Sequence, residues 1–156
     1  MVNQIKMSNL KIVCTLMAIL WFGNLFAGNG EVDSVQKLTK ADFYQKIMNL
    51  EKNSREWKYS GSLPCIVDFY ADWCGPCRQA SPILEELAQK YKGQIVVYKV
   101  NTDQEKELSV AFHIETIPAF LWVPVKGKPT MSNGIASDKE ETKAMFEKMI
   151  KEILLK

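Results

Sequence analysis

The chain contains few of the residues that dominate disordered, repetitive or disulfide-stapled proteins. Its 156 residues include 8 Gly, 6 Pro, 4 Cys and 1 His, and no block of sequence repeats. Sparse Gly and Pro without a repeat exclude a low-complexity chain and a solenoid, and 4 Cys are too few for a disulfide-dense scaffold. Hydrophobic residues make up 47% of the chain and charged residues 24%, which is the composition of a globular protein of one domain with a hydrophobic core.

The N-terminal segment has no acidic residue and differs from the rest of the chain. Lys6 and Lys11 precede an almost wholly apolar run over residues 12–22, and Leu25-Phe26-Ala27 then ends in a small residue. This order predicts a secretory signal peptide over residues 1–27, cleaved after Ala27. The alternatives are an uncleaved membrane anchor, for which the apolar run is short, and an ordinary N-terminal helix.

Removal of this segment changes the charge and the cysteine content of the protein. It takes away 2 of the 20 Lys and Arg and none of the 18 acids, so the domain over residues 28–156 has 18 of each sign. A near-neutral domain without a basic stripe is not expected to bind nucleic acid, nor to insert stably into a membrane after cleavage. Cys14 lies inside the apolar run rather than after it, so a lipid anchor is not expected. Cys65, Cys74 and Cys77 remain in the exported chain, which we expect in the periplasm.

Two of these cysteines form a Cys-x-x-Cys pair within Trp73-Cys74-Gly75-Pro76-Cys77. Such a pair can be redox-active, part of a metal site or a structural disulfide. A zinc site would need two further ligands, but only Cys65 and His113 remain and no suitable spacing joins them. We therefore expect no metal.

Hydrophobic periodicity predicts an α/β fold. Strands are predicted at residues 35–38, 65–70, 95–100, 119–123 and 130–132. Helices are predicted at residues 40–51 with Thr39 as the cap, from 76 to a stop at Gly93 with a kink at Pro82, at 105–112, and after a capping box of Ser137 and Glu140. Strands alternating with helices indicate a parallel sheet core, and the last two strands are close enough to form an antiparallel hairpin. The predicted architecture is a central mixed sheet with helices on both faces.

The predicted order of elements places Cys74 between a strand and a helix. A thiol at a helix start meets unpaired N–H groups and the positive end of the helix dipole, which stabilise the thiolate. Pro76 suits the first helical turn because its missing N–H would have no partner there, and Gly75 lets the backbone of a partner come close. Cys77, one turn further on, is positioned to attack a mixed disulfide formed at Cys74.

These residues resemble the thioredoxin family. The resemblance runs from about residue 35 to residue 155, and rests on Val67-Asp68-Phe69-Tyr70-Ala71-Asp72-Trp73-Cys74-Gly75-Pro76-Cys77, Pro82, Lys99 and Thr116-Ile117-Pro118. It implies a thioredoxin fold and a redox-active disulfide between Cys74 and Cys77, with no other cofactor.

The resemblance also implies roles for residues outside the dithiol. Asp68 would be a buried acid that assists proton transfer as Cys77 becomes a thiolate, with Lys99 as its partner; the alternative is a structurally satisfied polar residue. Pro118 would be a cis-proline facing the disulfide, and the Ile117 backbone would pair with an extended substrate. Trp73 would be an exposed aromatic flanking the site, unless it is a core residue.

The implied activity is protein thiol-disulfide exchange through a mixed disulfide. We expect a monomeric reductant of disulfide-containing exported proteins, supplied by an electron donor at the inner membrane. A disulfide oxidase or isomerase is the alternative within the same class, and a thioredoxin-fold binding or chaperone module is the alternative outside it.

Several residues depart from the family pattern or are expected to serve packing alone. The loop at 53–63 is longer than in a minimal thioredoxin, Val123-Pro124-Val125 adds a Pro to the final hairpin, and Tyr70 stands where the family often has Trp. Cys65 is expected to be inert rather than regulatory, and His113 to be solvated rather than catalytic. Trp57 and Trp122 are expected to pack.

Overall fold

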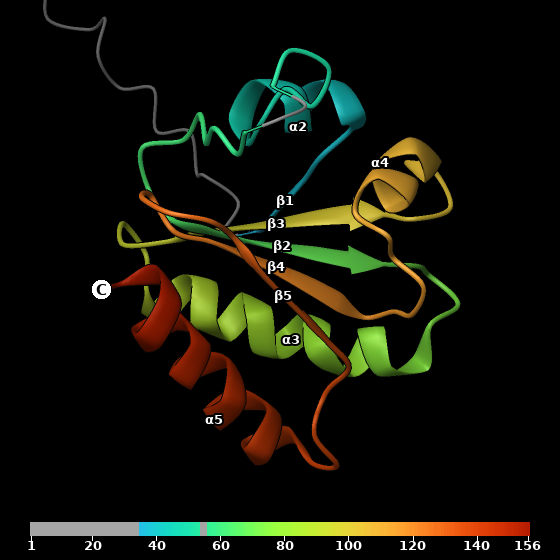
Figure 1. Cartoon of the computed structure of the whole chain (residues 1–156). Coiled ribbons are helices and arrows are strands. Elements are labelled where there is room, and N and C mark those ends of the chain that lie inside the picture. The colour runs from blue at the N-terminus through green and yellow to red at the C-terminus, as the bar shows by residue number, and fades with distance from the viewer. Residues whose placement is uncertain (1–34, 54–55) are drawn as a thin grey trace, which may run out of the picture. The chain divides into compact units, whose positions relative to one another are not determined.

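Five strands form one sheet with helices on both of its faces in the computed structural model, which describes residues 35–53 and 56–156 (Figure 1). The predicted signal peptide and its cleavage point lie outside these residues. The strands are β1 (Val35–Lys37), β2 (Cys65–Tyr70), β3 (Val96–Asn101), β4 (Ala119–Val123) and β5 (Thr130–Asn133). The helices are α2 (Lys40–Lys46), α3 (Gly75–Lys90), α4 (Lys106–Ala111) and α5 (Lys139–Met149), which continues into a π-helical turn, η1 (Ile150–Leu154).

The sheet is mixed, as the sequence predicts. Its strand order is β1-β3-β2-β4-β5. β1, β3 and β2 run parallel, whereas β4 is antiparallel to both of its neighbours. Because β2 and β4 run in opposite directions, the carboxyl end of β2 lies beside the amino end of β4, with Phe69 opposite Ala119.

Two hydrophobic clusters fill the space on the two faces of the sheet. Side chains alternate along β2: Ile66 belongs to the cluster under α3 and α5, and Val67 belongs to the cluster that includes Phe43 of α2 and Leu108 of α4. Figure 1 shows α3 and α5 on one face and α2 and α4 on the other. Asp68 points to the same face as Ile66, so the sheet places an acid under α3.

Local hydrogen bonds explain where the two ends of α2 fall. Thr39 and Asp42 form the capping box that begins the helix. The predicted continuation to residue 51 is wrong, because the helix ends at Lys46. The carbonyl of Ile47 accepts from the N–H of Ser60 at 2.8 Å, and the side chain of Asn49 accepts from Lys52 N–H at 2.9 Å. These bonds replace the next helical turn.

The start and the end of α5 also differ from the prediction. Asp138 is the N-cap, and its carboxylate accepts from the Glu141 N–H at 2.8 Å. The predicted capping box of Ser137 and Glu140 is therefore wrong; the Ser137 hydroxyl instead donates to the Glu141 carboxylate at 3.0 Å. A carboxylate at this position accepts a charge-assisted hydrogen bond and faces the positive end of the helix dipole. The π-helical turn of η1 was not predicted.

Candidate functional site

The dithiol pair lies at the junction of β2 and α3. Cys74 is the N-cap of α3, and Pro76 lies in the first helical turn, as predicted. Cys74 and Cys77 form a disulfide with 5.3 Å between their Cα atoms. The N–H of Cys77 donates to the Sγ of Cys74 at 3.2 Å. Once the disulfide is reduced, this N–H and the helix dipole stabilise negative charge on the Cys74 sulfur.

The segment before β4 lies against the same sulfur. The Ile117–Pro118 peptide bond is cis, which confirms the expectation for Pro118. The carbonyl oxygen of Ile117 lies 3.7 Å from Cys74 Sγ. A sulfur in a disulfide has no proton to donate, so this contact becomes a hydrogen bond only in the reduced thiol. The segment is also joined to the residue after β5, because the carbonyl of Pro118 accepts a hydrogen bond from the N–H of Gly134 at 2.8 Å. The φ of Gly134 is +76°, a backbone conformation that favours a residue without a Cβ.

Trp73 is exposed, with 69% of its surface accessible. This placement excludes the alternative of a core tryptophan. Its indole N–H donates to a carboxylate oxygen of Asp103 at 2.9 Å, and the N–H of Asp103 donates to the side chain of Asn101 at 2.9 Å. Asp103 was not among the residues predicted from the sequence. The signal was available, because the parallel strands β2 and β3 end at the same edge of the sheet.

Asp68 is fully buried in the middle of β2. Neither of its carboxylate oxygens has a hydrogen-bond partner, which argues against the alternative of a structurally satisfied polar residue. Burial raises the pKa of Asp68 from 3.8 to about 7, against the opposing effect of the Lys99 charge. A carboxyl group with such a pKa can accept or release a proton near neutral pH.

Lys99 lies opposite Asp68 in the register of β3 and β2. Its Nζ is 3.8 Å from Asp68 Oδ2, which makes an ion pair. The same ammonium donates a hydrogen bond to the hydroxyl of Ser81 on α3 and lies 4.4 Å from the centroid of the Tyr70 ring. Ser81 was also missed, although it follows Cys77 by four residues and so shares its helix face.

The other residues singled out from the sequence lie away from this cluster. Cys65 is a buried free thiol at the start of β2, and burial raises its pKa to about 12, in accord with an inert role. Trp122 is fully buried and donates to Ser132 at 2.8 Å. Trp57 is half-buried against Phe112, with 6.5 Å between the ring centroids. His113 is exposed just after α4.

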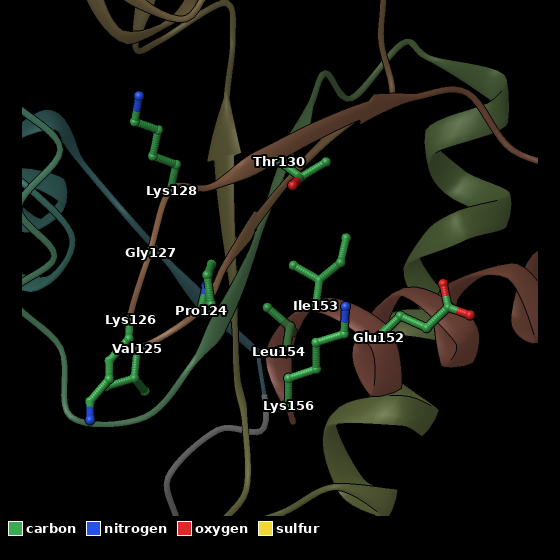
Figure 2. A pocket seen from close by; sticks show the side chains of 10 residues that line it. All are labelled: Pro124, Val125, Lys126, Gly127, Lys128, Thr130, Glu152, Ile153, Leu154 and Lys156. Atoms are coloured by element: carbon green, nitrogen blue, oxygen red, sulfur yellow. The ribbon is translucent and has the colours of Figure 1, made fainter.

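A pocket of about 560 Å³ lies at the opposite end of the sheet, between the β4–β5 hairpin and the end of η1 (Figure 2). Its lining includes Lys126, Lys128 and Lys156 but none of the predicted site residues. In Figure 2 the side chains of Lys126 and Lys128 extend in opposite directions, so they do not converge on one ligand.

Within residues 35–53 and 56–156, no group of three or more His, Cys, Asp or Glu side chains could hold a metal ion. Over the same residues, none of the helices has both the length and the apolar character needed to span a bilayer.

Comparisons with known proteins point to one family. The family model for thioredoxin matches residues 34–152. The chain is 44% identical over 115 residues to a thioredoxin of Borreliella burgdorferi, covering 74% of this chain and 93% of the relative. It is 38% identical over 88 residues to a thioredoxin of Pyropia yezoensis, covering 56% and 72% respectively. Among solved structures it resembles chloroplastic thioredoxin z, with a TM-score of 0.56 and 23% identity over 74% of this chain and 93% of that one, a likeness that supports the fold.

Proposed function

The chain belongs to the thioredoxin family and is a thioredoxin-type protein-disulfide reductase, and we propose that it reduces disulfides of exported proteins in the periplasm.

The chemistry begins at Cys74. In the reduced protein the Cys74 thiolate attacks one sulfur of a partner's disulfide; a mixed disulfide forms, and the partner's other sulfur leaves as a thiolate that takes up a proton. Cys77 then loses its proton, with Asp68 as the acceptor, and attacks Cys74 Sγ. The mixed disulfide breaks, the second partner sulfur leaves and is protonated, and the Cys74–Cys77 disulfide forms. Two electrons pass from the dithiol to the partner.

The hydrogen bond from Cys77 N–H to Cys74 Sγ, at 3.2 Å, is the observation on which this assignment rests. This bond supports the assignment of Cys74 as the sulfur whose negative charge the start of α3 stabilises. Cys77 has no equivalent bond among those of the described residues, which fits its role as the resolving thiol. Trp73, Ile117 and Pro118 border Cys74 and are the surface against which a partner segment would lie, with Gly75 and Pro76 beside it.

The direction of electron flow is proposed from the residues between the cysteines. Gly75-Pro76 resembles the reducing members of the family. Thioredoxins are the type example of such reductants, with an established reduction potential of about −270 mV, whereas that of the periplasmic oxidase of the same fold is about −120 mV. Equilibration of the purified protein with glutathione buffers measures this quantity. A potential above about −180 mV, the value of an isomerase, would contradict a reductant.

The compartment is proposed from residues 1–27, whose pattern is that of a secretory signal peptide. A reductant in the periplasm has no direct access to NADPH, so it requires an electron donor at the inner membrane. The mass of the protein recovered from cells tests this part of the proposal. Cleavage after Ala27 is expected, and a protein that keeps Met1 would rule out the predicted export.

Trapping of partners tests the order of the two thiols. A Cys77→Ser variant is expected to accumulate mixed disulfides at Cys74, because no second thiol can release the partner. The matched Cys74→Ser variant is expected to trap none, since the remaining Cys77 is not the attacking thiol. Mass spectrometry of the trapped partners identifies substrates. Equal trapping by both variants, or none by either, would contradict the assignment.

A further inference from the structure

The ammonium of Lys99 is held by groups other than the carboxylate it faces. It donates a hydrogen bond to Ser81 Oγ and lies over the ring of Tyr70, 4.4 Å from the centroid. Its distance to Asp68 Oδ2 is 3.8 Å. Lys99 therefore has its hydrogen-bond acceptor on α3, although the buried carboxylate of Asp68 lies beside it on β2.

This arrangement is unusual for a lysine and a carboxylate that are direct neighbours in a sheet. Charge-assisted hydrogen bonds between ammonium and carboxylate groups are normally 2.7–2.9 Å long. Asp68 and Lys99 are register partners, so such a bond is within reach of the side chains. Asp68 nevertheless has no hydrogen-bond donor on either oxygen, because the ammonium is directed to the Ser81 hydroxyl.

We propose that Ser81 is a positioning residue that accepts a hydrogen bond from the Lys99 ammonium and so holds this ammonium away from the Asp68 carboxyl group, with the Tyr70 ring as the second contact. The catalytic consequence of this inference rests on the proposed function, since Asp68 is the group assigned there to accept the proton of Cys77. The position of Lys99 itself does not depend on any assumed substrate.

The groups around Asp68 leave Lys99 as its nearest charge. Lys99 faces it from β3 at 3.8 Å, and its register partner on β4 is the apolar Phe120. Tyr70 of β2 and Ser81 of α3 contact the Lys99 ammonium. A cavity of about 390 Å³ with Cys77, Ser81 and Lys99 in its lining also has Asp72 and Arg78 in its wall. Among the described residues, Lys99 is the one cation at ion-pair distance from Asp68.

The position of Lys99 decides how well Asp68 serves as a base for Cys77. At 3.8 Å the ammonium leaves the effect of burial dominant, and the pKa of Asp68 is about 7. A direct hydrogen bond at about 2.8 Å would stabilise the carboxylate further. With an effective dielectric constant of about 20, Coulomb's law makes this approach equivalent to about a tenfold loss of proton affinity. The carboxylate would then be a weaker base in the resolving step.

Titration of Asp68 in the Ser81→Ala variant tests the proposal. The measurement follows the carboxyl carbon of labelled Asp by NMR in the oxidised protein, where the disulfide removes both site thiols from the titration. Ser81 is a half-buried residue within α3, and Ala is the better helix former, so the variant is expected to fold. Its titration midpoint should fall by about one pH unit.

The conservative variant Ser81→Thr separates the hydroxyl from other effects of the substitution. It keeps the acceptor for Lys99, so the midpoint of Asp68 should stay at the wild-type value. A midpoint that is unchanged or raised in Ser81→Ala would overturn the proposal, and so would an equal fall in both variants. The NMR titration requires no partner and no direction of electron flow. A redox potential that contradicts the reductant would therefore leave the position of Lys99 unaffected. An unchanged Asp68 midpoint in Ser81→Ala would likewise leave the direction of electron flow unaffected.

Discussion

Replacing the buried carboxyl of Asp68 should remove most of the pH dependence of stability between pH 4 and pH 8. Asp68 is fully buried, without a hydrogen-bond partner, and its pKa is raised from 3.8 to about 7, chiefly by burial. In the unfolded chain the same group loses its proton near pH 4. The folded protein therefore binds one more proton than the unfolded chain between these two values, and its stability falls as pH rises through this window.

The size of the effect follows from the difference between the two pKa values. About three pH units at 1.36 kcal/mol each give a loss of about 4 kcal/mol between pH 4 and pH 8. Below pH 4 both states are protonated and the contribution vanishes, and above pH 7 both are ionised and the loss is complete. Asp68→Asn has nearly the same volume and no charge at any pH, so the variant should gain about 4 kcal/mol relative to wild type on going from pH 4 to pH 8.

Urea unfolding of the oxidised protein at a series of pH values measures this difference. Use of the oxidised protein keeps Cys77 from titrating. Glu85→Gln is the matched control, because it removes an exposed carboxylate from α3; its curve should run parallel to that of wild type. The Asn amide also lacks a partner, so only the change with pH is informative and not the absolute stability. Parallel curves for wild type and Asp68→Asn would refute the reasoning.

Three further predictions concern the packing of Phe146, the cap of α5 and the reactivity of Cys65. Phe146→Ala should lower the free energy of unfolding by about 3–5 kcal/mol, because the ring is fully buried 4.7 Å from that of Phe120; denaturant unfolding measures the loss, and a change below 1 kcal/mol would contradict the packing. Asp138→Ala should lower the free energy of unfolding by about 1 kcal/mol, because it removes the N-cap of α5, and Ser137→Ala should lower it by less. Denaturant unfolding measures both, and a larger loss in Ser137→Ala would contradict Asp138 as the cap. Cys65 should resist alkylation by iodoacetamide in the native protein, since its thiol is buried and has a pKa of about 12. Alkylation at the rate of a free thiol would contradict the inert role of Cys65.

The sheet and its helices were predictable because their hydrophobic periods are strong. Residues 65–70 form a run with one acid and are buried along their whole length, and the apolar stripe of α3 includes Ile83, Leu84 and Leu87, all buried. The errors lie at helix ends. There the outcome depends on single hydrogen bonds such as Ser60 N–H to Ile47 C=O, which join residues that no local pattern relates.

The site was predictable to different degrees for different residues. The predicted order of elements places Cys74 between a strand and a helix, and the structure has this junction. The approach of Lys99 to Asp68 followed only from the family resemblance, and the register of the parallel strands β2 and β3 places the two residues opposite each other. The hydrogen bond from Lys99 to Ser81 was not predictable, because it depends on how α3 lies across the sheet.

The single change of strand direction at β4 explains why remote segments meet at the dithiol. β2 and β3 are parallel, so their carboxyl ends share one edge of the sheet, where Tyr70 pairs with Asn101. If β4 were also parallel, its carboxyl end would lie at this edge, and the residues before it would lie at the other. Because β4 is antiparallel, Ile117 and Pro118 instead arrive beside Cys74, 43 residues away in sequence. The same reversal sends the hairpin after β4 to the opposite end of the sheet, away from Cys74.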